Sequence, residues 1–231
     1  MMVRLIAMTP HPETVAGLAA LNCRHPRYVR EQLEAHPDMR SIPRNFGKIL
    51  GKCIESGHMS VFEHVSLTFH VDGISRACSH QLVRHRLASY TQSSQRFEAA
   101  PWDRPNVIPR SIESIDARLN IYENALDAMH NAFITLIESG VPQEDARYVL
   151  PNAAQTSLIV TMNARELWHF LTLRLCKKAQ WEIRELARRM WDWARSQHGF
   201  PLLFKRCGPP CAFGECREKG PCHNDQEEEE P

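Results

Sequence analysis

Residues 64–97 read HVSLTFHVDGISRACSHQLVRHRLASYTQSSQRF and join three different patterns. The first nine residues alternate strictly between apolar and polar side chains, the apolar ones being Val65, Leu67, Phe69 and Val71. A period of two is typical of a β-strand with one buried face. We therefore predict a strand over residues 64–72 whose other face carries His64 and Ser66. These two side chains either point at a ligand or are ordinary polar strand residues.

After Gly73 the spacing of the apolar residues becomes helical, and this pattern continues as far as Arg84. Gln81 and Arg84 lie three residues apart, so we expect both on one side of that helix. Residues 87–110 contain Pro101, Pro105 and Pro109. Proline-rich segments favour loops, and this one is predicted to be an extended loop.

The N-terminal part of the chain is mainly helical in pattern. Residues 3–8 are a candidate for a short opening strand. Residues 12–57 have helical spacing and composition, with interruptions expected at Pro26 and Pro43.

A long helix is predicted from about Ser111 to Ser139. Gly140 suits the end of that helix, because glycine readily adopts the left-handed conformation of a helix terminus. Pro142 suits the first turn of the next helix.

Residues 155–162 (QTSLIVTM) are predicted to form another strand. Asn163 and Glu166 then have the spacing of a capping box, so a helix is expected to start there and to continue, with a break near Lys177, to about Ser196. Because helices outnumber strands, we predict an α/β (α+β) fold with a small, mostly antiparallel sheet covered by long helices. The order of the strands does not follow from the sequence.

Composition narrows the class of protein. The 231 residues carry a net charge of +1, which argues against a nucleic-acid or anionic-membrane partner recognised by overall charge. No apolar run approaches the roughly 20 residues that a membrane-spanning helix needs. We expect a cytoplasmic protein with one domain over residues 1–204 and a Cys-rich, acidic tail over residues 205–231.

The eight cysteines are unevenly distributed, and four of them lie in the last 25 residues together with a histidine: Cys207, Cys211, Cys216, Cys222 and His223. These residue types suit a structural zinc or iron–sulfur site, but the spacing is not that of paired CxxC motifs. A flexible tail with reducible thiols is the preferred interpretation, and no metal site is predicted.

The segment after Leu82 carries the strongest functional signal. Arg84, Arg86 and Arg96 supply guanidinium donors, and the hydroxyl and amide side chains between them supply short-range donors and acceptors. A solvated basic helix end would explain the first two arginines but not the hydroxyl-rich loop closed by a third. This mixture favours a site for a phosphorylated ligand that contains a ring.

Arg174 is the second informative position. In the helix predicted after Asn163 it shares a face with Leu167, Phe170 and Leu171. A guanidinium on an apolar face needs a partner, which would be either a buried glutamate or an anionic ligand. Arg165 and His169 are expected on a different side of the same helix. Arg147, between two prolines, is weak evidence by itself.

Four ordered blocks resemble the flavin-dependent thymidylate synthases, the ThyX family. The signature is Arg-His-Arg, a seven-residue gap, Ser, and an Arg two residues further on, which is matched by residues 84–96. The other blocks are GHMSVFEHVSLTFHV before the signature, ESGVPQEDARYVLP after it, and MNARELWHFLTLRL followed by AQWEIR. Together they cover most of residues 50–200 in the order of the family.

The resemblance implies a thymidylate synthase-complementing protein fold and a homotetramer. It also implies an enzyme that binds FAD, dUMP, NADPH and 5,10-methylenetetrahydrofolate. Such an enzyme transfers the one-carbon unit to C5 of uracil and reduces it with a flavin hydride, which yields dTMP. Ser94 would bind substrate and would not form a covalent adduct.

The resemblance also assigns residues. Those expected at the flavin are Ser66, Arg84, His85, Arg86, Gln92, Asn163, Ala164, Arg165 and His169, with His64 near flavin and folate. Those expected at dUMP are Gln81, Leu82, Val83, Arg84, Gln92, Ser93, Ser94, Gln95, Arg96, Arg147 and Arg174. Arg174 is the expected catalytic residue, because a fixed cation beside uracil would favour its N3-deprotonated, electron-rich form.

Some positions depart from the family pattern. Gln92 stands where glutamate also occurs, and Lys178 replaces a common histidine. No Gly-rich dinucleotide fingerprint is present, so FAD would not be held by a βαβ unit. Two alternatives stay open on sequence grounds, namely an RNA- or nucleotide-binding protein and a relative that catalyses another flavin-linked reaction.

Overall fold

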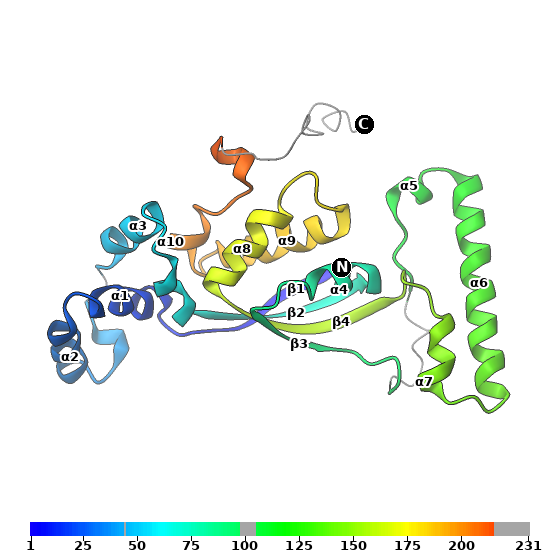
Figure 1. Ribbon diagram of the computed structural model, residues 1–231, viewed down its shortest axis with the longest axis horizontal. Coiled ribbons are helices and arrows are strands. Elements are labelled where there is room, and N and C mark those ends of the chain that lie inside the picture. Colours follow the sequence, from blue (N-terminus) through cyan, green and yellow to red (C-terminus); the bar gives the residue numbers. More distant parts are fainter. Residues whose placement is uncertain (44, 98–104, 215–231) are drawn as a thin grey trace. The chain divides into compact units, whose positions relative to one another are not determined.

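The computed structural model describes residues 1–43, 45–97 and 105–214 (Figure 1). The chain packs into two compact units. Among the described residues, the first unit contains Met1–Met2, Val71–Arg84 and residues 91–97 and 105–159. The second unit contains residues 3–43 and 45–70, His85–Tyr90 and residues 160–214. The boundary therefore falls within the Arg-His-Arg signature, between Arg84 and His85.

Within the described residues, four antiparallel strands form one sheet in the order β1-β2-β4-β3. The strands are β1 (Met2–Met8), β2 (Ser66–Ser75), β3 (Ala88–Gln92) and β4 (Gln155–Asn163). The register of the central pair is marked by a 2.9 Å hydrogen bond between the hydroxyls of Thr68 and Thr161. The strands predicted over residues 3–8 and 155–162 are confirmed as β1 and β4, and the small antiparallel sheet is confirmed as well.

β2 has the buried face that its alternation predicts, because Val65, just before it, and Leu67, Phe69 and Val71 within it are all fully buried. Its bounds differ from the prediction, however. His64 ends the 3-10 helix η2 (Met59–His64) and is not a strand residue, so His64 and Ser66 do not share a strand face.

β2 also continues through Gly73, where a helix was expected to follow at once. Gly73 has φ +75°, a left-handed conformation that side chains with a Cβ rarely adopt. A Cβ there would lie 3.3 Å from the backbone nitrogen of Met1. The helix α4 (Arg76–Leu82) begins only after Ser75, whose hydroxyl accepts a hydrogen bond from the Cys78 N–H at 2.9 Å.

The prediction of a loop over residues 87–110 is wrong at its start, because Ala88–Gln92 is strand β3. Just after it, the Ser93 N–H donates to the carbonyl oxygen of Ser157 in β4 at 2.9 Å. The segment joins the sheet through its backbone, and its mostly polar side chains lack the apolar alternation from which a strand is predicted. Residues 98–104 of the predicted loop lie outside the described residues.

The second unit is mainly helical. Its α-helices are α1 (Pro12–Asn22), α2 (Pro26–Ala35), α3 (Gly47–Glu55), α8 (Ala164–Arg174), α9 (Trp181–Ala194) and α10 (Pro201–Phe204). Short 3-10 helices are η1 (Met39–Ser41), η2 and η4 (Pro210–Phe213). The expected interruptions near Pro26 and Pro43 and near Lys177 are therefore present. α8 packs against α9, beside which it lies in Figure 1, and against η2. The buried residues of these three helices include Phe62, Leu167, Phe170, Ile183 and Leu186.

The first unit carries α4, α5 (Arg110–Glu113), α6 (Asp116–Glu138), α7 (Gln143–Ala146) and η3 (Arg147–Val149). The helix predicted over residues 111–139 is thus split into α5 and α6 and ends at Gly140, which has φ +87° as expected. Pro142 is the residue before α7 and not part of its first turn. Phe133 is the buried residue of the 23-residue α6.

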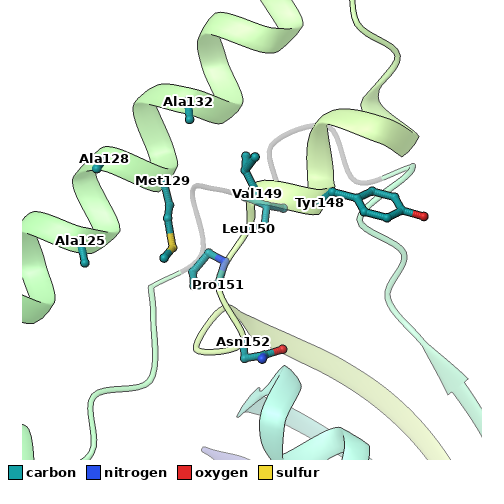
Figure 2. A pocket seen from close by; sticks show the side chains of 9 residues that line it. All are labelled: Ala125, Ala128, Met129, Ala132, Tyr148, Val149, Leu150, Pro151 and Asn152. Atoms are coloured by element: carbon teal, nitrogen blue, oxygen red, sulfur yellow. The ribbon is translucent and has the colours of Figure 1, made fainter.

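An open apolar groove lies in the first unit between α6 and the segment from Tyr148 to Asn152 (Figure 2). Ala125, Ala128 and Ala132 line it from α6. Ile121, which is 72% exposed, lies one turn before Ala125 on the same side of the helix.

Two further features concern the described residues only. None of their helices is long and apolar enough to cross a membrane. They hold no cluster of three metal-ligating side chains; Cys207 is buried and Cys211 is exposed. Burial raises the pKa of the Cys207 thiol to about 12. Cys216, Cys222 and His223 lie outside the described residues.

Candidate active site

The two units divide the predicted site residues into two sets. Those in the first unit are Gln81, Leu82, Val83, Arg84, Gln92, Ser93, Ser94, Gln95, Arg96 and Arg147. Those in the second unit are His64, Ser66, His85, Arg86, Asn163, Ala164, Arg165, His169 and Arg174. All but two residues of the first set were predicted only for dUMP, and all of the second set except Arg174 were predicted for flavin.

His85 is the most buried charged or titratable member of the signature, with 5% of its surface exposed. It lies in the link between α4 and β3, since α4 ends at Leu82 and does not continue to Arg84 as predicted. Its ring packs edge-on against Phe170, with centroids 4.9 Å apart. Its carbonyl oxygen accepts a 2.8 Å hydrogen bond from the Tyr90 hydroxyl.

The His85 ring lies between a cation and a carboxylate. Arg174 Nε donates to His85 Nε2 at 3.2 Å, while His85 Nδ1 lies 3.5 Å from Glu166 Oε1. Burial lowers the pKa of His85 to about 4, and the charges of Arg174 and His169 act in the same direction. The imidazole is therefore neutral near pH 7.

This arrangement defines how Arg174 is held. Leu167, Phe170 and Leu171 are fully buried on its side of α8, as the helical spacing predicts. Within the described residues, the printed partner of the guanidinium is the neutral imidazole of His85 and not the glutamate that the sequence offered as one alternative. A neutral partner fixes the guanidinium without cancelling its charge.

At the start of α8, two residues predicted to contact the flavin also form hydrogen bonds within the fold. The Asn163 side chain accepts from the Glu166 N–H at 2.8 Å, which confirms the N-cap. The Ala164 N–H donates to the Val65 carbonyl oxygen at 2.7 Å. Arg165 and His169 are exposed, and Arg165 forms an ion pair with Glu63.

In the first unit, Gln92 and Ser93 belong to a hydrogen-bonded cluster. Gln92 Nε2 donates to Ser79 Oγ at 3.1 Å and to Thr156 Oγ1 at 3.0 Å. The Ser93 hydroxyl lies 3.0 Å from the same Thr156 oxygen. Because its amide nitrogen is held by two buried hydroxyls, Gln92 has a defined orientation with its carbonyl oxygen as the remaining acceptor.

Arg96 and Arg147 meet at Glu144. Arg96 Nε lies 2.7 Å from Glu144 Oε2, and Arg147 Nε donates to the Glu144 carbonyl oxygen at 2.9 Å. The Ser94 hydroxyl accepts from the Arg96 N–H at 3.3 Å. The structure thus brings together two arginines that are distant in sequence and that were predicted to hold one phosphate.

The remaining predicted residues are placed singly. Arg84, Arg86 and Val83 are exposed, Gln81 is half-buried and Leu82 is buried. Ser66 is half-buried and its N–H donates to Thr9 Oγ1 at 2.9 Å, whereas His64 is exposed. Lys178 is half-buried.

Sequence reasoning missed Glu144, and it missed the contact between Glu166 and His85. Glu166 was recognised only as a capping position. Its carboxylate is 7% exposed and faces His85, a partner distant in the chain that no local pattern reveals. Glu144 could have been suspected, since it precedes Arg147 by three residues in a predicted helical turn.

Comparison with known proteins gives the family. The family model of thymidylate synthase complementing proteins matches residues 4–198. A flavin-dependent thymidylate synthase of Geobacter sulfurreducens is 46% identical over 95% of this chain and 92% of its own length. The chain belongs to the family of flavin-dependent thymidylate synthases. A second member, from Saccharolobus solfataricus, is 51% identical over 92% of this chain and 79% of its own length.

Solved structures agree with this family. The flavin-dependent thymidylate synthase ThyX of Helicobacter pylori, in complex with FAD and dUMP, has a TM-score of 0.67 and 26% identity over 90% of this chain and 100% of that chain. The UMP/dUMP methylase PolB of Streptomyces cacaoi, at 22% identity, covers 94% of this chain and 97% of its own with a TM-score of 0.73 and supports the fold alone. The expected fold is confirmed.

Proposed function

We propose that this chain, as a flavin-dependent thymidylate synthase, converts dUMP to dTMP with FAD as its redox cofactor. The observation that carries this conclusion is the 46% identity to a flavin-dependent thymidylate synthase over nearly the whole of both chains. We further propose 5,10-methylenetetrahydrofolate as the one-carbon donor and NADPH as the reductant.

The residues present fit FAD. Arg84, Arg86 and Arg165 are exposed residues, and guanidiniums are suited to bind the oxygens of a diphosphate; Arg165 would exchange its ion pair with Glu63 for this contact. Ser66, Gln92, Asn163, Ala164 and His169, with His85 and His64, are the other residues we assign to the flavin region. When bound, FAD supplies the hydride that the reaction needs, while the protein supplies orientation and electrostatics.

For dUMP, we assign the phosphate to Arg96 and Arg147. Arg96 contacts the carboxylate of Glu144 and Arg147 its backbone carbonyl oxygen, so both guanidiniums are held at one residue before substrate binds, which reduces the ordering cost of binding a dianion. Because Arg96 is paired with Glu144, the phosphate would either displace this carboxylate from Arg96 or share the Arg96 guanidinium with it. The other residues assigned to dUMP are Gln81, Leu82, Val83, Arg84, Gln92, Ser93, Ser94 and Gln95.

Arg174 is assigned to the uracil ring. Its charge, held through a neutral partner, would stabilise uracil deprotonated at N3 and so make C5 more electron-rich. Ser94 has a different task, since its hydroxyl accepts from the Arg96 N–H and contacts no base that would activate it for nucleophilic attack. This statement concerns the described residues.

We propose that the enzyme is a cytoplasmic homotetramer. The exposed apolar groove along α6 supports assembly, since contiguous apolar surface of this kind is typical of subunit contacts (Figure 2). We also propose that residues 1–204 form the catalytic domain and that residues 205–231 are an accessory tail without a required metal.

Two measurements test the function. Purified protein should be yellow and should release FAD on denaturation; a colourless protein with no affinity for FAD would favour a plain nucleotide- or RNA-binding role. Tritium should then be released from C5-labelled dUMP, and this release should depend on NADPH and methylenetetrahydrofolate. Bound FAD without any release would point to another flavin-linked reaction.

The Arg174→Ala variant tests the activating residue. We expect it to retain FAD but to lose dUMP turnover by about 100-fold or more, as is usual when a group that stabilises developing charge is removed. Arg184→Ala, which removes a guanidinium bonded to the Lys177 carbonyl oxygen at 2.8 Å, is the matched control. Unchanged turnover in Arg174→Ala would contradict the assigned role.

A further inference from the structure

Glu166 is a buried carboxylate to which the family resemblance gives no role. It lies in the first turn of α8, and only 7% of its side chain is exposed. Burying a carboxylate is unfavourable unless a polar partner compensates, and burial raises the pKa of Glu166 accordingly. The helix N-terminus stabilises negative charge to some extent, but it does not determine where the carboxylate points.

The contacts of the His85 ring define which of its two nitrogens carries the proton. Arginine has only donors, so the 3.2 Å contact with Arg174 Nε requires a lone pair on His85 Nε2. A neutral imidazole has one N–H, which must then be on Nδ1. Nδ1 is the atom that faces Glu166 Oε1 at 3.5 Å.

Three groups therefore form a line of buried or half-buried contacts, from Glu166 through His85 to Arg174. Phe170 packs edge-on against the His85 ring and restricts its rotation. Since Glu166, Phe170 and Arg174 all belong to α8, one helix holds the ring on two sides and carries the arginine that the ring orients.

We propose that Glu166 is a positioning residue of the thymidylate reaction, acting through the tautomer of His85 to aim Arg174 at the uracil ring. The inference rests on the proposed function for the role of Arg174. The carboxylate stabilises the N–H on Nδ1, which leaves Nε2 free to accept from Arg174. Without the carboxylate, the proton can move to Nε2, and this site would then repel the Arg174 donor.

Two substitutions separate hydrogen bonding from charge. Glu166→Leu removes both the acceptor and the charge, whereas Glu166→Gln removes the charge but keeps a carbonyl oxygen that can accept from Nδ1–H. In the FAD-loaded enzyme, we expect Glu166→Leu to lower kcat/KM for dUMP by about 10- to 100-fold, a range typical of residues that orient a functional group. Glu166→Gln should lower kcat/KM for dUMP by a smaller factor than Glu166→Leu.

FAD content and the control variant exclude a general structural defect. Glu185→Gln, on α9, removes a carboxylate that pairs with Arg188 and Arg189 at the surface, and it should leave kcat/KM unchanged. All variants should bind FAD in the wild-type ratio. Equal kcat/KM in the wild type and Glu166→Leu would overturn the proposal.

A direct measurement tests the positioning step independently of catalysis. In protein labelled with 15N-histidine, with the His85 signal assigned by its loss in His85→Gln, the wild type should show the proton on Nδ1. Glu166→Leu should shift it toward Nε2. A wild-type proton on Nε2 would overturn the inference even if Glu166→Leu does not fold. If the wild type makes no dTMP, the proposed function fails, while the tautomer still decides whether Glu166 orients His85.

Discussion

At the scale of single residues, the main finding is a neutral histidine inside a signature that looks uniformly basic. Arg84 and Arg86 are exposed, while His85 between them is buried and has a pKa of about 4. The three residues therefore perform different tasks. The two arginines are available to a ligand, and the histidine connects Glu166 to Arg174 within the protein.

The low pKa of His85 predicts a pH-dependent stability. The unfolded chain takes up a proton on His85 near pH 6.5, but the folded chain does so only near pH 4. Stability contributed by this group is therefore complete above pH 6.5 and is lost as the pH falls toward 4, by at most about 3 kcal/mol. The raised pKa of Glu166 acts in the opposite direction, and it is present in both proteins compared below.

The test compares wild type with His85→Gln. The difference in thermal midpoint between the two proteins should be large at pH 7.5 and should shrink between pH 6.5 and 4.5, because only the wild type loses the His85 contribution. His169→Gln, which alters an exposed ring, should follow the wild type more closely. A difference between wild type and His85→Gln that is constant with pH would contradict the low pKa.

At the scale of elements, the transition from β2 to α4 depends on Gly73. Its left-handed backbone lets the strand continue to Ser75 before α4 begins, and its missing Cβ leaves room for the backbone of Met1. A helix that started at Ile74, as the apolar spacing suggests, would move every residue of α4. The glycine thus contributes to the position of Gln81 and of the signature that follows.

Gly73→Ala should lower the stability by about 1–2 kcal/mol from the left-handed backbone alone, and further from the contact with Met1. For a chain of this size, each kcal/mol corresponds to about 2–4 °C in thermal midpoint. Gly57→Ala is the matched control, because Gly57 has φ +70° but its Cβ would have no described atom within 4 Å. Equal losses in both variants would show that the Met1 contact contributes nothing.

At the scale of the whole molecule, the exposed face of α6 is a feature that the described part of a single chain leaves uncovered. α6 has 23 residues, of which Phe133 is buried, and Ile121 and Tyr148 are 72% and 84% exposed. Tyr148 lines the groove, and Ile121 lies one turn before Ala125, which lines it from α6; exposed apolar side chains in and next to one groove favour contact with another copy of the chain.

Ile121→Lys should therefore weaken the proposed tetramer, because a charge would be buried in the contact between subunits. Sedimentation velocity should show smaller assemblies for this variant and the wild-type species for His130→Lys, which adds a charge about two and a half turns further along α6, on the opposite face of the helix. A tetramer unaffected by Ile121→Lys would exclude the α6 groove from the contact, and a wild-type monomer would contradict the tetramer itself.

The sequence by itself determined the features that depend on short-range periodicity and capping. These include the buried face of β2, the N-cap of α8 at Asn163, the end of α6 at Gly140 and the apolar side of α8 that carries Arg174. The ordered motifs also identified the family, since recognition of a pattern needs only the order of residues.

Only the tertiary structure decided which distant residues meet. Arg174 and His85 are 89 residues apart in the chain, and their hydrogen bond exists because α8 packs beside the link between α4 and β3. The pairing of β3 with the chain near Ser157 and the meeting of Arg96 with Glu144 are of the same kind. Such contacts depend on how the chain closes over long separations, and local propensity carries no information about them.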